Sequence, residues 1–174
     1  MKWVKQSIHY WCPDTKEHKF LGQNVTVAIL DTGISPHPDF KDRILSFRDF
    51  SSTTGSSEKV LFSFSHFSPL IDNSGHGTHV AGILAGSGLL SSGTYAGIAP
   101  FCNLIIGKVL DQNGNGSIKN VINGIQWIRD IYTQFHIRII NISVGTRPDL
   151  SIHQKLLLLN AVESLWDLGL VVVV

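Results

Sequence analysis

Short apolar runs rich in Val, Ile and Leu alternate along the chain with longer segments in which apolar residues recur every three or four positions. The short runs fit strands buried on both faces, and they lie at 25–30, 44–50, 103–110, 138–144 and 170–174. The longer segments fit amphipathic helices, and they lie at 76–86, 118–128 and 150–168. Ser117 is the expected N-cap of the second helix. On the first helix, Val80, Ile83 and Leu84 share one face, which we expect to be buried against a sheet.

This alternation of strands and helices predicts an α/β fold in three layers, with a mainly parallel sheet, helices on both of its faces and right-handed crossovers. Partial alternation at 61–67 predicts a β-ribbon ahead of the first helix, and 51–57 is expected to be a surface loop. Residues 1–21 are mixed and aromatic, so we expect an N-terminal arm or a short helix there, with the main domain at 22–174.

Composition and charge exclude several classes of function. The chain has 174 residues, 43% of them hydrophobic, which is sufficient for one globular domain. Lys and Arg total 14 against 13 for Asp and Glu, so no nucleic-acid partner is expected. No apolar run approaches the roughly 20 residues that span a bilayer, so no membrane partner is expected either.

The 2 cysteines, Cys12 and Cys102, are too few in a chain of this length to indicate a disulfide framework. We therefore expect free thiols. Free thiols favour the reducing cytoplasm as the compartment, or secretion if a leader precedes the sequence given.

Two polar turns carry the candidate chemistry. Asp31 follows the run at 25–30, and His76 opens the helix at 76–86. Both are expected at the edge where parallel strands end, which is where catalytic groups collect. Because a helix N-terminus disfavours an imidazolium, His76 is predicted to be a neutral general base, with Asp31 fixing its tautomer. Taken separately, Asp31 could equally be a turn carboxylate and His76 an ordinary helix cap.

The chain also carries a series of short motifs, namely Ile29-Leu30-Asp31-Thr32-Gly33, His37-Pro38-Asp39, His76-Gly77-Thr78-His79-Val80-Ala81-Gly82, Tyr95-Ala96-Gly97-Ile98-Ala99-Pro100, Lys108-Val109-Leu110, Asn123-Gly124-Ile125 and Asn141-Ile142-Ser143-Val144-Gly145. In this order they resemble the subtilisin-like serine peptidases, or subtilases. The resemblance covers residues 22–174 and implies the N-terminal part of a subtilisin-like catalytic domain.

The resemblance implies a serine-type endopeptidase in which Asp31 is the orienting acid and His76 the general base. It also implies a cleft for an extended polypeptide, whose backbone would pair with two facing segments. These segments are Ser143, Val144 and Gly145 on one side and Gly114, Asn115 and Gly116 on the other. We expect the complete protein to be a monomer that needs no cofactor for its chemistry.

A metal site is not expected from the histidines. His79 lies one turn beyond His76 with no third ligand signal, so we expect a packed histidine rather than a zinc ligand. The resemblance implies a possible structural calcium at Asp39 and the loop 86–93. That loop has no carboxylate or amide side chain, so hard oxygen ligands are scarce.

The nucleophile that the resemblance implies is not in the sequence, because neither Gly-Thr-Ser nor the G-x-S-x-G pattern occurs. We therefore expect a truncated domain, with the nucleophilic serine and the oxyanion-binding asparagine encoded after Val174. Residues 1–174 alone are expected to be inactive. The strand at 170–174 is expected to be exposed and unpaired.

Other classes of function fit some of the same residues. A pseudo-peptidase would use the same cleft, binding peptides along the segment that contains Ser143 without hydrolysing them. An aspartic peptidase would use Asp31-Thr32-Gly33, but it needs a second such triplet and a β-rich chain, and the alternation of strands with helices opposes it.

Overall fold

The computed structural model describes residues 2–8, 10, 20–51, 58–60, 71–145 and 150–174. In this part of the chain the strands are β1 Thr26–Asp31, β2 Ile44–Asp49, β3 Glu58–Val60, β4 Asn103–Lys108, β5 Ile137–Ile142 and β6 Val171–Val173. The α-helices are α1 Lys2–Ser7, α2 His76–Ala85, α3 Ile118–Ile131 and α4 Ile152–Trp166. Short 3-10 turns occur at Pro38–Phe40 and Leu89–Ser91.

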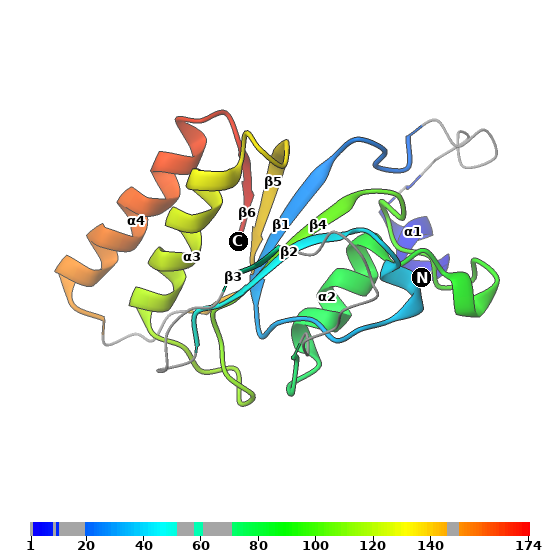
Figure 1. The fold of residues 1–174 in the computed structure, drawn as a ribbon, viewed down its shortest axis with the longest axis horizontal. Coiled ribbons are helices and arrows are strands. Elements are labelled where there is room, and N and C mark those ends of the chain that lie inside the picture. The colour runs from blue at the N-terminus through cyan, green and yellow to red at the C-terminus, as the bar shows by residue number, and fades with distance from the viewer. Residues whose placement is uncertain (1, 9, 11–19, 52–57, 61–70, 146–149) are drawn as a thin grey trace.

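The strands form a 6-stranded sheet in the order β3-β2-β4-β1-β5-β6. Every pairing is parallel except that of β3 with β2, which is antiparallel. Helices α3 and α4 cover one face of the sheet and α2 lies on the other (Figure 1). The expected three-layer α/β fold is therefore confirmed. Strand β3 was not expected, and the β-ribbon predicted at 61–67 lies outside the described residues.

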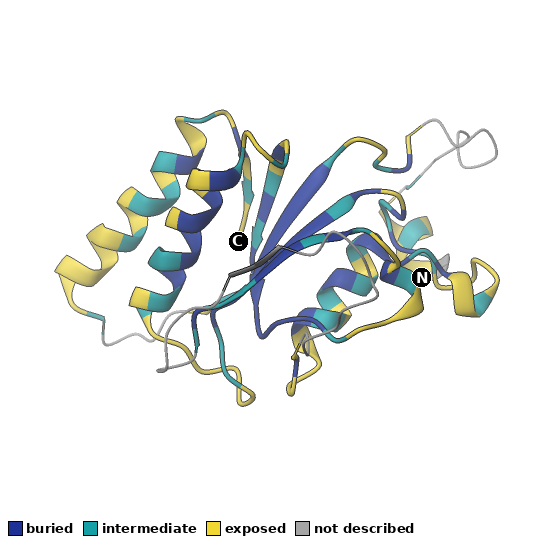
Figure 2. Cartoon of the chain, in the orientation of Figure 1, coloured by how far each residue is buried: buried dark blue, intermediate teal, exposed yellow. Residues whose placement is uncertain are grey.

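Strand β1 is the centre of the fold. All of its residues are buried, because β4 and β5 pair with its two edges and helices cover both faces (Figure 2). Its alternate side chains serve two hydrophobic clusters. Ala28 and Leu30 belong to the cluster beneath α3 and α4, whereas Val27 and Ile29 belong to the one beneath α2. This two-sided burial is the reason for the continuous apolar run in the sequence.

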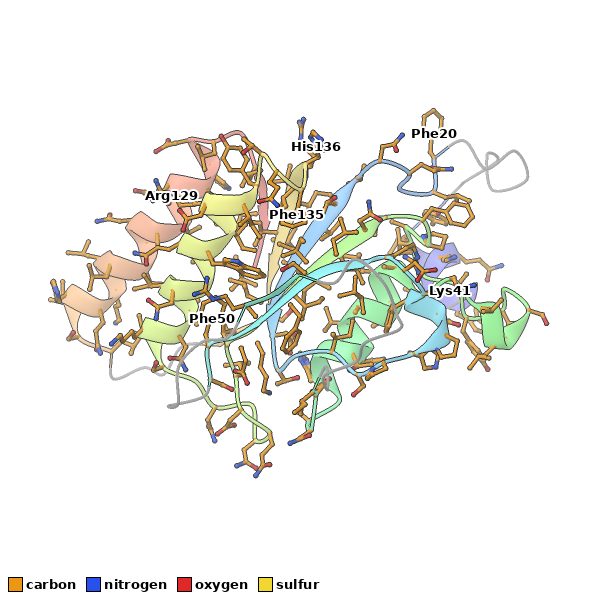
Figure 3. The ribbon with its side chains drawn as sticks, viewed as in Figure 1. Phe20, Lys41, Phe50, Arg129, Phe135 and His136 are labelled. Atoms are coloured by element: carbon orange, nitrogen blue, oxygen red, sulfur yellow. The ribbon has the colours of Figure 1, made fainter. Side chains whose placement is uncertain are left out.

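Helix α3 follows the sequence prediction. The Ser117 hydroxyl accepts the backbone N–H of Asn120 at 3.1 Å, so Ser117 is the N-cap. The helix ends at Ile131, slightly beyond the predicted 118–128. On its buried face, the centre of the Trp127 ring lies 5.8 Å from the centre of the Phe50 ring. Phe50 follows the last residue of β2 and is labelled in Figure 3.

The predicted buried face of α2 is confirmed only in part. Val80 and Leu84 are partly buried and pack against the cluster beneath the helix, whereas Ile83 is 41% exposed. The residues that the helix buries fully are Gly77, Ala81 and Ala85, which are four residues apart and therefore lie on one face. Small residues allow the helix axis to approach the sheet closely. This close approach is what brings His76, at the start of the helix, to Asp31 at the end of β1.

The expectation of an unpaired strand at 170–174 also needs correction. Strand β6 pairs in parallel with β5, with Ile139 opposite Val171 and Asn141 opposite Val173. Its outer edge carries no further strand within the described residues, and Val171 is 57% exposed.

Within the described ranges, no helix is long and apolar enough to cross a membrane. Helix α1 lies at the end of the molecule where β1 and β4 begin (Figure 1). The adjoining Tyr10 hydroxyl donates a hydrogen bond to the Ile98 carbonyl at 2.9 Å, which connects this segment to the loop before β4.

Cys102 is a fully buried free thiol, and this burial raises its pKa to about 11. Because the thiolate is the reactive form, we expect iodoacetamide at pH 8 to alkylate native Cys102 at least about a hundredfold more slowly than the unfolded chain. Peptide mapping by mass spectrometry with and without guanidinium would measure both rates. Equal rates would contradict the burial. Cys12 lies outside the described residues.

Candidate active site

Asp31 is the last residue of β1, at the edge of the sheet where the parallel strands end. Its side chain is fully buried, and its Oδ1 accepts the backbone N–H of Thr32 at 2.6 Å. A buried carboxylate is costly unless donors surround it. The position therefore requires a second partner, which comes from the start of α2.

His76 is that partner. Its Nδ1 lies 2.8 Å from Oδ1 and 3.1 Å from Oδ2 of Asp31, across a sequence separation of 45 residues. The side chain of His76 is 54% exposed, whereas that of Asp31 has no exposure. Since Nδ1 serves the carboxylate, Nε2 is the ring nitrogen left to exchange a proton with a ligand.

The pKa of His76 is raised above its ordinary value, first by the hydrogen bond to Asp31 and then by the charge of the same carboxylate. This direction is opposite to the one expected from the helix N-terminus. The carboxylate is in direct contact with the ring, so it outweighs the weaker, diffuse effect of the helix dipole. The site therefore stabilises the imidazolium that forms when the base accepts a proton.

Asp72 holds the turn that places His76, a role that the sequence reasoning missed. Its carboxylate accepts the hydroxyl groups of Thr32 at 2.8 Å and Thr78 at 2.6 Å. It also accepts backbone N–H groups of Ser74, Gly75 and Thr78 at 3.2, 2.9 and 2.8 Å. Burial favours the neutral acid, but these hydrogen bonds outweigh it and lower the pKa of Asp72. The sequence signal that could have identified this role is an aspartate placed shortly before the start of a helix.

Close backbone contact joins α2 to the turn after β1. A Cβ on Gly77 would collide with the carbonyl oxygen of Gly33, and Gly33 itself has a φ of +116°. The Gly77 N–H donates to the Thr32 hydroxyl at 2.9 Å. Buried Lys108 donates from Nζ to the carbonyls of Thr32 and Leu110. These contacts tie the ends of β1 and β4 to the start of α2.

The two predicted substrate segments line one cavity of about 500 Å³. Gly114, Asn115 and Gly116 approach it from the loop before α3, and Val144 and Gly145 from the end of β5. Ser143 is not in the lining, and its hydroxyl accepts a hydrogen bond from the Asn141 side chain at 2.6 Å. The structure thus brings these segments together, apart from the Ser143 side chain.

The remaining walls of the cavity are mainly apolar. They are formed by Leu110, Ile118, Val121, Leu150 and Leu158. Gly116 has to be glycine for this shape, because a Cβ there would lie 2.6 Å from the Val109 carbonyl oxygen. The cavity can therefore accept an apolar side chain between two stretches of exposed backbone.

His79 is exposed, so the expectation of a packed histidine is wrong. It lines a separate cavity of about 430 Å³ beside α2, together with His37, which is also exposed. No cluster of His, Cys, Asp or Glu suited to a metal ion occurs within the described residues.

The carboxylate of Asp39 does not fit a calcium ligand well. Its two oxygens accept the backbone N–H groups of Gly88 at 2.9 Å and Leu90 at 3.3 Å. The loop 86–93 thus turns N–H donors, rather than oxygen atoms, toward this carboxylate.

Comparison with known proteins extends over most of the chain. A family model described as the subtilase family matches residues 22–173. Serine protease AprX of Bacillus subtilis (strain 168) is 41% identical over 158 residues, covering 88% of this chain and 33% of that protein. The major intracellular serine protease of the same organism is 38% identical over 130 residues, covering 74% and 36%. The chain spans about a third of the length of these relatives.

Solved structures show the same arrangement of sheet and helices. The CspB protease of Clostridium perfringens matches with a TM-score of 0.75 and 27% identity, over 91% of this chain and 36% of that one. Sphericase matches with a TM-score of 0.71 and 27% identity, over 87% and 45%.

The raised pKa of His76 should depend on Asp31. In Asp31→Asn we expect the His76 pKa to fall toward about 6.5, because the charge that favours the imidazolium is lost. NMR titration of the imidazole Cε1–H signals would measure it, with His76→Gln giving the assignment. Asp130→Asn, at an exposed position on α3, is the control and should leave the value unchanged. An unchanged His76 pKa in Asp31→Asn would contradict the contact.

Asp72 should contribute to stability in a pH-dependent way. Its pKa is lowered from 3.8 on folding, so its ionised form stabilises the fold above that pH, and the contribution is lost as pH falls through the lowered value. We expect Asp72→Asn to lower the melting temperature by about 4 °C or more at pH 7 and by less below pH 4. Asp130→Asn, at an exposed position on α3, is the matched control. A pH-independent difference would refute this role.

Proposed function

The chain belongs to the subtilase family, and from this premise we propose that it supplies the acid and the base of a serine endopeptidase. The observation that carries the proposal is the contact between buried Asp31 and exposed His76 at 2.8 Å. A carboxylate that orients an imidazole while leaving its second nitrogen accessible is the arrangement needed to activate a hydroxyl nucleophile.

In the proposed reaction, His76 accepts the proton of a serine hydroxyl through Nε2 as the serine oxygen bonds to the carbonyl carbon of the scissile peptide. The ring then gives that proton to the leaving amine as the peptide C–N bond breaks. Asp31 remains ionised and stabilises the imidazolium between these steps, and water later releases the acyl group. The serine comes from a segment outside residues 1–174, so we propose that these residues alone do not catalyse hydrolysis.

The substrate in this proposal is an extended polypeptide. The backbones at 114–116 and 144–145 flank it and offer hydrogen bonds that do not depend on its sequence. The apolar walls of the same cavity support a preference for an apolar side chain at one substrate position. Leu158, which contributes to the wall from α4, is partly buried and therefore held in place.

A fluorophosphonate probe tests the proposal, because it labels only an activated serine. The protein from the complete reading frame should be labelled and should cleave casein, whereas residues 1–174 should do neither. His76→Ala should reduce both rates by about 10⁴-fold or more. His79→Ala, an exposed histidine on the same helix, is the matched control and should retain activity.

Labelling that survives His76→Ala would exclude the proposed base. Absence of both labelling and cleavage in the folded complete protein would exclude a serine peptidase and favour peptide binding without chemistry.

A further inference from the structure

The loop 86–93 follows the C-terminal end of α2 (Figure 1) and is held there by Asp39. The Asp39 carboxylate accepts the N–H groups of Gly88 at 2.9 Å and Leu90 at 3.3 Å. The Asp39 carbonyl oxygen accepts the N–H group of Ser87 at 3.1 Å. Gly88 has a φ of +72°, and backbone that turns through this left-handed region commonly gathers N–H groups around an anion. The loop is therefore shaped to hold an anion, and Asp39 supplies it.

The carbonyl oxygens of this loop are already used by its own hydrogen bonds. A calcium ion takes roughly six to eight oxygen ligands, mainly from carboxylates, backbone carbonyls and water. The loop contains only Gly, Ser and Leu, so its carbonyls would have to supply most of the protein ligands. These carbonyls instead accept N–H groups from residues 91–97, at Gly86, Gly88, Ser91 and Gly93. The donor set at Asp39 and the loop therefore does not fit calcium.

Arg43 brings a positive charge to the same place. Its guanidinium donates to the carbonyl oxygen of Asp39, to that of Ala85 at 2.7 Å and to that of Cys102 at 2.9 Å. These carbonyls lie in the turn Pro38–Phe40, at the end of α2 and just before β4, so one side chain joins three segments. Backbone carbonyls are also common ligands of calcium. Arg43 thus satisfies such oxygens with a cation that the chain itself carries.

The end of α2 depends on the same contacts. The carbonyls in the last turn of a helix have no partner inside it. On α2 the carbonyls of residues 82–85 accept, in order, the N–H groups of Gly86, Ile98 and Ala99 and the guanidinium of Arg43. The helix dipole also favours a cation at this end. Since His76 is the first residue of the helix, Arg43 helps to fix the element that carries the candidate base.

We propose that Arg43 and Asp39 take the place of a structural calcium ion, so that the loop 86–93 and the end of α2 are held without a metal. The guanidinium takes the carbonyl oxygens, and the loop N–H groups take the carboxylate. A calcium ion that entered would have to displace those N–H groups, and the charge of Arg43 would repel it. Every contact in this network joins residues between 39 and 102, so it requires no other part of the chain.

Hydrogen exchange of the folded protein, followed by mass spectrometry of peptides from 86–99, tests the proposal at the loop itself. It would be measured in excess EDTA and in calcium at about 5 mM, which is above the dissociation constants of weak extracellular sites. The two exchange rates should agree within about twofold. Exchange that calcium slows by more than this would overturn the proposal. Because the measurement is local, calcium bound elsewhere in the protein does not obscure it.

Substitutions test whether Arg43 and Asp39 hold the loop. Arg43→Met keeps a long side chain but removes the donors and the charge, so it should speed exchange in 86–99 by about tenfold or more, with or without calcium. Asp39→Asn is a smaller change that removes the anion and should act in the same direction. Arg129→Met, at an exposed position on α3, is the matched control and should leave the rate unchanged.

Circular dichroism would confirm that each variant is folded, and Asp39→Asn decides alone if Arg43→Met does not fold. Exchange that is unchanged in the folded variants, or equally fast in Arg129→Met, would overturn the proposal. A loop held by calcium would give the opposite pattern, because it would lose protection in EDTA and respond little to Arg43→Met.

Discussion

Burial of the Asp31 carboxylate is the constraint on which the candidate site depends. A charge removed from water costs several kcal/mol unless hydrogen-bond donors replace the lost solvent. Here the donors are the backbone of Thr32 and the Nδ1 of His76, which are far apart in the sequence. The end of β1 and the start of α2 must therefore stay in contact. Asp72 makes that possible, because its carboxylate collects the hydroxyl and N–H groups of the intervening turn.

The small residues of α2 serve the same requirement. A helix centred on Val80, Ile83 and Leu84 would stand further from the sheet, since branched side chains would separate the two layers. With Gly77, Ala81 and Ala85 at the centre of the contact and Val80 and Leu84 at its margin, α2 comes close enough for its backbone to meet that of Gly33. Helix α2 therefore buries less apolar surface than it could, which lowers its contribution to stability. In return, His76 is held at the end of β1.

Much of this architecture could be predicted from the sequence, and the failures have physical causes. Runs of β-branched residues located the parallel strands, and Ser117 located the start of α3, because each depends on local pattern. The buried face of α2 could not be read in this way, since apolar periodicity identifies large residues and the packing here uses small ones. The direction of the His76 pKa depends on a contact across 45 residues, and the hydrogen-bond network of Asp72 depends on tertiary structure.

The position of β1 at the centre of the sheet has a consequence for how the pair can come apart. Asp31 lies on a strand whose two neighbours must both separate before it can move, so its position lasts as long as the folded domain does. His76 is the first residue of its helix, but the N–H groups of its neighbours Gly75, Gly77 and Thr78 are bonded to Asp72 and Thr32. The acid is therefore a fixed reference point, and the base can move only by rotation of its own side chain. Such a rotation can release the imidazole and return it to the same carboxylate without disturbing the helix or the sheet.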